Sequence, residues 1–194
     1  MPVTPMPDLL ISDYRAIRSE IRAGDVVFFS QDTRGVKKVT QFVSWRIKCD
    51  QTPPHQCTHV GLLDWVHERC VVIEATSPRV RVSPLSMFVC ETEGPDGKRV
   101  APYDGTVHVG RFEGCESFDA VCAAWDNLLL PYDVLDLAAI RLGIKRSNTR
   151  QYICSELVAE ALRAGGVALK KPANGWIHTP ADLALSAHML WRLR

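Results

Sequence analysis

The stretch that decides the fold is 58–75, THVGLLDWVHERCVVIEA, in which two β-rich runs flank a short polar turn. Residues 58–65 and 70–75 are rich in the apolar and β-branched side chains that strands favour. His67 and Glu68 separate the two runs. We therefore predict a β-hairpin with these two residues at the centre of its turn.

This hairpin predicts a pair of polar neighbours. A turn centred between residues 67 and 68 pairs residues whose numbers sum to 135, so Gly61 faces Glu74. His59 and Glu74 are then diagonal neighbours on one face, with space above Gly61 between them. A register shifted by two would place Glu74 directly opposite His59, and a shift by one would send it to the other face. A carboxylate beside a histidine fixes its tautomer and stabilises the imidazolium.

A second informative stretch is 151–164, which predicts a helix ended by Gly165 and Gly166. Cys154 lies in its first turn, where unpaired N–H groups and the helix dipole favour a thiolate. The same N–H groups could bind the oxyanion formed when sulfur attacks a carbonyl. The alternative is a buried core cysteine, because it shares one helical stripe with Leu157, Val158, Ala161 and Leu162.

Length and composition set the outer bounds. The chain has 194 residues, 46% hydrophobic and 23% charged, which suits one globular domain over 1–194 with an N-terminal extension at 1–23. A net charge of +1 gives no reason to expect a nucleic-acid partner. The longest apolar run is 120–125, far short of a membrane span. Because no signal-peptide pattern is present and the seven cysteines are irregularly spaced, we expect a cytoplasmic protein with free thiols.

The remaining segments favour an α+β fold with an antiparallel sheet packed against helices. Strands are expected at 26–29, 79–82 and 107–112, and a loop at 91–105. Helices are expected at 12–21, 36–47, 118–130, 133–142 and 180–192.

Short motifs follow one another in a specific order. They are GDVVFF at 24–29, THVG at 58–61, VIEA at 72–75, PYD at 131–133, YICSELV at 152–158 and TPADL at 179–183. The series resembles the YiiX/YaeF-type permuted papain-fold amidases, the circularly permuted branch of the NlpC-like cysteine hydrolases. The resemblance covers most of the chain, from about residue 24 to 185.

The resemblance implies a papain-like fold in which the histidine strand precedes the cysteine helix. By motif position it assigns the nucleophile to Cys154, the base to His59 and the third polar residue to Glu74. Tyr132 and Asp25 also lie in family motifs. We expect Tyr132 to line the substrate cleft and Asp25 to be a structural turn carboxylate.

The function expected from these residues is hydrolysis of an amide bond through a thioester, with no cofactor. A peptide, an N-acyl amine or a lipid-linked amide would serve as substrate, and the oligomeric state is left open. One alternative is an acyltransferase or lipid esterase of the lecithin retinol acyltransferase-like type. Another is a non-catalytic domain that keeps the fold and binds ligands in its groove.

Two further groups contain residues that could take part in chemistry. Cys49, His55, Cys57 and His59 lie close in sequence, but their spacing is not that of a usual structural zinc site, so we expect no metal there. Glu156 follows Cys154 by two on the helix and points away from the sulfur, so we expect a helix-start charge.

Overall fold

A computed structural model describes residues 10–30, 57–93, 99–100, 103, 105–133, 152–172 and 177–193. The helices predicted at 36–47 and, apart from Asp133, at 133–142 lie outside the described residues. So do Cys49 and His55.

The centre of the fold is a six-stranded antiparallel sheet with the order β4-β3-β2-β1-β7-β8. Its strands are β1 (Val26–Ser30), β2 (Cys57–Val66), β3 (Arg69–Thr76), β4 (Arg79–Pro84), β7 (Thr106–Arg111) and β8 (His188–Arg192). A separate two-stranded pair consists of β5 (Thr92–Glu93) and β6 (Arg99–Val100), within the segment predicted as a loop.

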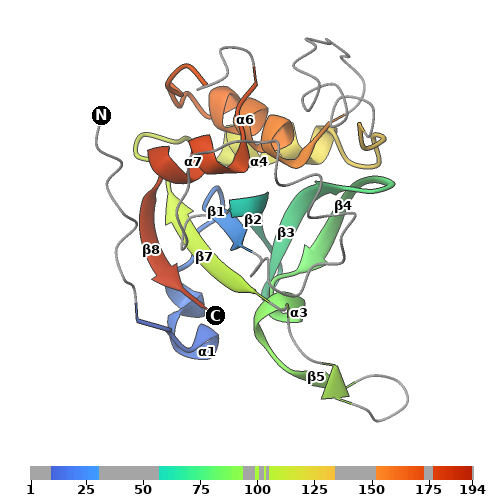
Figure 1. The fold of residues 1–194 in the computed structure, drawn as a ribbon, viewed down its shortest axis with the longest axis vertical. Helices are drawn as coiled ribbons and strands as arrows, with labels where there is room; N and C mark the ends of the chain where they lie inside the picture. The colour runs from blue at the N-terminus through green and yellow to red at the C-terminus, as the bar shows by residue number, and fades with distance from the viewer. Residues whose placement is uncertain are drawn as a thin grey trace.

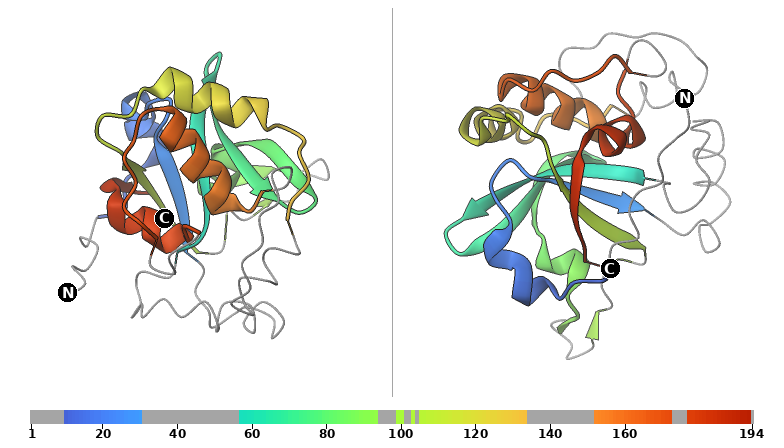
Figure 2. Two further views of the ribbon diagram at one scale, coloured as in Figure 1. Left: turned by 90° about the horizontal axis from the view of Figure 1, so that it is seen from above. Right: turned by 90° about the vertical axis from the view of Figure 1, so that its left-hand side faces the viewer.

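Helices lie on both sides of this sheet, as Figure 1 and the right-hand view of Figure 2 show. One side carries α4 (Ser117–Asp126), α6 (Cys154–Ala164) and α7 (Pro180–Ser186). On the other side lie α1 (Tyr14–Ile17), the short 3₁₀ turn η1 (Arg18–Glu20) and α3 (Ser86–Val89). None of the described helices is long and apolar enough to cross a membrane. The predicted α+β class is confirmed.

Two hydrophobic clusters fill the space on either side of the sheet. Strand residues alternate between them, because successive side chains point to opposite faces. Val60 and Leu62 pack beneath the three-helix side, whereas Leu63 packs on the other side with Tyr14 and Ile21. Residues from the segment predicted as an N-terminal extension thus contribute to the second cluster. Burial on both faces explains why the central strands are apolar with little interruption.

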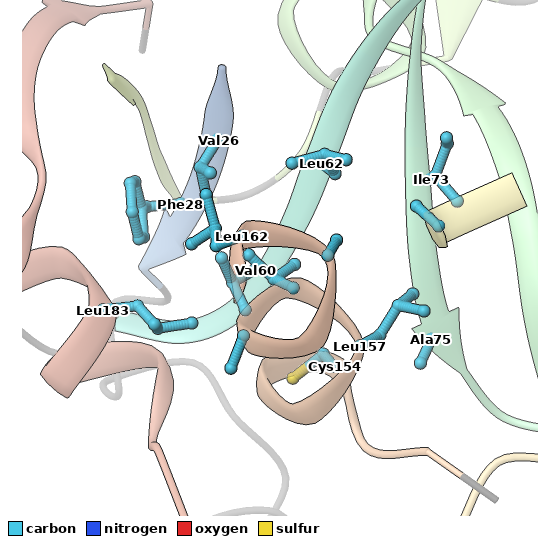
Figure 3. Packing of buried hydrophobic residues seen from close by; sticks show 14 of the residues in the cluster. Val26, Phe28, Val60, Leu62, Ile73, Ala75, Cys154, Leu157, Leu162 and Leu183 are labelled. Carbon is cyan, nitrogen blue, oxygen red and sulfur yellow. The ribbon is translucent and has the colours of Figure 1, made fainter. Parts of the chain in front are cut away.

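Local hydrogen bonds and a glycine define the two ends of helix α6. The Ile153 N–H donates to Glu156 Oε2 at 3.1 Å, which caps the first turn. The helix ends before Gly166, whose φ of 81° few other residues tolerate, and Val167 N–H returns to Leu162 O at 2.9 Å. Figure 3 shows Cys154 in the first turn and Leu157 directed toward β3.

The predicted helix at 180–192 is wrong in its second half. Helix α7 stops at Ser186, and 188–192 form β8, which pairs with β7 through Met189↔Gly110 and Trp191↔Val109. Its apolar spacing suits a helix, but backbone pairing with a neighbouring strand outweighs this local preference.

Helix α4 also ends earlier than predicted, at Asp126 rather than Leu130. Leu129 has a φ of 68°, which interrupts the helix, and its N–H donates to Val80 O at 3.1 Å. Val80 N–H donates in turn to Leu130 O at 2.8 Å. This backbone segment therefore covers the outer edge of β4 instead of extending the helix.

Candidate active site

The hairpin of β2 and β3 has the predicted register. The pairs run from Leu62↔Ile73 to Val66↔Arg69, and each pair of residue numbers sums to 135. The two-residue turn contains His67, with a φ of 53°, as tight hairpin turns require. The predicted pairing of the two strands, which places His59 and Glu74 on the same face of the hairpin, is therefore confirmed for the backbone.

His59 and Glu74 meet beyond the last registered pair. The His59 Nε2 and Glu74 Oε2 atoms lie 2.6 Å apart. Gly61 belongs to β2 at this point, and a Cβ on it would fall 2.4 Å from Val72 Cγ1 and 3.5 Å from Glu74 Cβ. Only glycine allows β2 and β3 to approach this closely beneath the two polar side chains.

Glu74 is almost completely buried, with 2% of its side chain exposed, and three side chains bind its carboxylate. Oε2 faces His59, while Oε1 accepts hydrogen bonds from Arg81 Nε and Ser83 Oγ, both at 3.0 Å. Sequence reasoning missed Arg81 and Ser83. A signal was available, since a two-residue turn at 77–78 places Arg81 directly opposite Glu74, as observed.

These contacts decide the charge of Glu74. Burial raises the pKa of a carboxyl group. The hydrogen bond and charge of His59, followed by the charge and hydrogen bond of Arg81, lower the pKa of Glu74 by more than burial raises it. The net pKa is below the ordinary value of 4.5. Glu74 is therefore an anion at neutral pH despite its burial.

Cys154 reaches the same histidine from the three-helix side of the sheet. It is buried in the first turn of α6, close enough to His59 for its charge to raise the pKa of the imidazole. Because Nε2 of His59 is engaged by Glu74, Nδ1 is the ring nitrogen left for the sulfur. The structure thus joins His59 to Glu74 and places Cys154 in their neighbourhood, at the first turn of α6.

The His59 ring is held between polar and aromatic neighbours. Its side chain is 26% exposed, and its ring centroid lies 5.5 Å from that of Phe29 on β1. Burial lowers its pKa, whereas the charge and hydrogen bond of Cys154, and then those of Glu74, raise it. The result is a pKa of about 10 instead of 6.5. The arrangement favours the imidazolium form of His59.

Tyr132 lies close to Cys154 because two backbone contacts hold its segment. Tyr132 N–H donates to Pro78 O at 2.9 Å, and Tyr132 forms a parallel bridge with Tyr152, two residues before the cysteine. Burial, followed by the negative charge of Cys154, raises the pKa of Tyr132. Its hydroxyl therefore stays protonated and can donate a hydrogen bond at this position.

Asp25 has the structural role expected of it. It is 1% exposed, and its two oxygens bind Arg111 Nε and Nη2 at 2.7 and 2.8 Å. Arg22 N–H donates to Oδ2 at 2.8 Å. The bidentate pair fixes the start of β1 against β7. Glu156, as expected, caps α6.

The comparisons with known proteins agree with this architecture. No family model matches the sequence, and neither does any curated protein. Among solved structures, the chain is similar to the crystal structure of the metalloprotein YiiX from Escherichia coli O157:H7, with a TM-score of 0.51 and 20% identity. The match covers 84% of this chain and 78% of that one. The chain therefore has the fold of YiiX, as the order of its sequence motifs predicted.

Proposed function

We propose that the protein is a cysteine hydrolase that cleaves an amide bond through a thioester. The observation that carries this proposal is the position of His59, whose Nε2 meets Glu74 Oε2 at 2.6 Å while the charge of the nearby Cys154 raises its pKa. Nucleophile, base and the group that orients the base are the three parts that thiol-based acyl transfer requires.

In the first step the Cys154 thiolate attacks the amide carbonyl carbon, and the carbonyl electron pair moves to oxygen. The backbone N–H of Cys154, at the N-terminus of α6, is a donor for that oxyanion. When the intermediate collapses, the C–N bond breaks and the amine leaves with the proton of the His59 imidazolium. The acyl group stays on sulfur as a thioester.

In the second step His59, now neutral, takes a proton from water as the water attacks the thioester. The C–S bond breaks, a carboxylic acid leaves, and the thiolate–imidazolium pair is restored. Glu74 keeps its charge throughout and stabilises the imidazolium that appears in each cycle. We assign Tyr132 to the wall of the substrate site, since burial and the charge of Cys154 raise its pKa and keep its hydroxyl protonated.

YiiX is described as a metalloprotein, which raises the question whether the residues of this site fit a metal ion. Glu74 is already engaged by a guanidinium and an imidazole, and a metal ion would have to displace both. Within the described part of the chain, no group of three or more histidine, cysteine, aspartate and glutamate side chains is placed to hold a metal ion. These residues do not fit a metal site, and the mechanism uses none.

The test is a screen of acyl-amides and short peptides with the wild type and Cys154→Ala. We expect amide cleavage by the wild type, a covalent adduct on Cys154 detectable by mass spectrometry, and loss of both in the variant. A folded Cys154→Ala protein that cleaves as fast as the wild type would refute the proposal.

The same screen separates the rival functions. An acyltransferase or lipid esterase would prefer lipid esters and pass the acyl group to an added amine or alcohol rather than to water. A non-catalytic binding domain would bind ligands equally well with and without the Cys154 sulfur, and no adduct would form.

A further inference from the structure

We propose that Arg81 and Ser83 of β4 are positioning residues that hold the Glu74 carboxylate in the orientation His59 needs. The inference rests on the proposed function, in which Glu74 orients the base. Arg81 and Ser83 do not touch the sulfur in this arrangement. They act on the reaction through the carboxylate alone.

The geometry divides the carboxylate into two ends with different partners. Oε1 accepts from Arg81 Nε and Ser83 Oγ, each at 3.0 Å, and Oε2 meets His59 at 2.6 Å. A carboxylate bound at one oxygen by a single partner can rotate about its last bond. Two donors on Oε1 oppose that rotation and keep Oε2 directed at the imidazole.

The pairing of the strands brings the partners of the Glu74 carboxylate together. Arg81 lies directly opposite Glu74 across β3 and β4, and Ser83 lies opposite Val72, one diagonal step away. His59 approaches from β2 on the other side of β3. The central strand thus carries the carboxylate, and its two neighbours supply the groups that bind it.

Burial explains why one partner would not be enough. Only 2% of the Glu74 side chain is exposed, so water contributes little to stabilising its charge. Hydrogen bonds to the charged form keep a buried carboxylate ionised. Without them, Glu74 would take up a proton more readily, and a neutral carboxyl group no longer stabilises the imidazolium.

The two residues contribute in different ways. Ser83 is buried and neutral, so its hydrogen bond is protected from salt. The Arg81 side chain is 52% exposed, so its charge is partly screened by solvent ions. We therefore expect the Arg81 contribution to weaken at high ionic strength and the Ser83 contribution to persist.

The experiment measures the rate of Cys154 alkylation by iodoacetamide against pH, together with turnover of any substrate found in the screen. In Arg81→Met and Ser83→Ala we expect the acid limb of both profiles to move to higher pH, because Glu74 is protonated more easily. We expect kcat/KM to fall about 10-fold in each variant. This is the lower end of the loss in activity that follows when a metal-binding histidine loses the partner that orients it, and Arg81 and Ser83 act here through a comparable outer contact. Ser83→Thr should restore the wild-type profile, and Arg81→Lys should restore part of it.

Matched controls separate positioning from general packing. Arg69→Met removes an exposed arginine at the far end of the same sheet. Ser30→Ala removes a buried hydroxyl that bonds to none of the described residues. Both controls should leave the acid limb where it is in the wild type, and circular dichroism should show all variants folded.

The outcomes distinguish this inference from the function on which it rests. If wild-type Cys154 is alkylated near neutral pH no faster than a buried core thiol, the proposed function fails. If it is alkylated rapidly but the acid limb is the same in the wild type, Arg81→Met, Ser83→Ala and the variant that combines these two substitutions, the positioning role fails and the proposed function stands.

Discussion

His59 is the residue on which both steps of the proposed reaction depend, because one imidazole must take up and release each proton. His59→Ala should therefore lose roughly 100- to 10,000-fold in kcat/KM. Cys154→Ala should abolish covalent turnover, and the double variant should be little worse than Cys154→Ala, since the two act as a unit. Glu74→Gln should lose less, because an amide still accepts a hydrogen bond. Steady-state rates on one substrate, with circular dichroism as the folding control, test this ranking.

The same two side chains predict how stability changes with pH. Folding lowers the pKa of Glu74, so its carboxylate contributes stability that is complete above 4.5 and lost as pH falls through the lowered value. Folding raises the pKa of His59, so its charge contributes stability that is complete below 6.5 and lost as pH rises through about 10.

Urea unfolding across the pH range measures this contribution. The difference in free energy of unfolding between the wild type and Glu74→Gln should shrink as pH falls below 4.5. The difference between the wild type and His59→Gln should shrink as pH approaches about 10. Differences that stay constant with pH would contradict the assigned charges.

At the scale of elements, the contact between β2 and β3 controls the distance from His59 to Glu74. Gly61→Ala would place a Cβ 2.4 Å from Val72 Cγ1, which forces the strands apart. We expect a loss of about 1–3 kcal/mol in the free energy of unfolding, together with reduced alkylation of Cys154. Val72→Ala in the same chain removes the closest atom and should recover part of both losses. A double-mutant cycle with no coupling between the two positions would contradict this explanation.

The same hairpin shows what the sequence could predict. Its two-residue turn fixed the register, and the register brought His59 and Glu74 to one face. Assigning Cys154 to the same site required the family resemblance, because a distant helix has no register with a strand. β8 was missed because HMLWR at 188–192 is by itself compatible with a helix. It forms a strand because its backbone pairs with that of β7. Ser83 was missed because the strand predicted at 79–82 stopped one residue short of it.

At the scale of the whole molecule, the described cysteines differ sharply in their surroundings. All six of them are free thiols. Burial, followed by the charge of Asp25, raises the pKa of Cys70 to about 12, and burial also raises that of Cys115. Near neutral pH we expect iodoacetamide to label Cys154 in the folded protein and Cys70 only after unfolding. Peptide mapping by mass spectrometry measures this, and rapid labelling of native Cys70 would contradict it.

The order of elements along the chain has a consequence for biosynthesis. His59 and Glu74 belong to one hairpin and are only 15 positions apart, whereas Cys154 belongs to a helix near the other end of the sequence. During translation the hairpin leaves the ribosome long before α6 does, so the base and its carboxylate are made while the nucleophile is still absent. On the proposed function, an unfinished or truncated polypeptide therefore carries no activated thiol. Reactivity begins only when helix α6 docks, which protects a nascent chain and its neighbours from premature acylation.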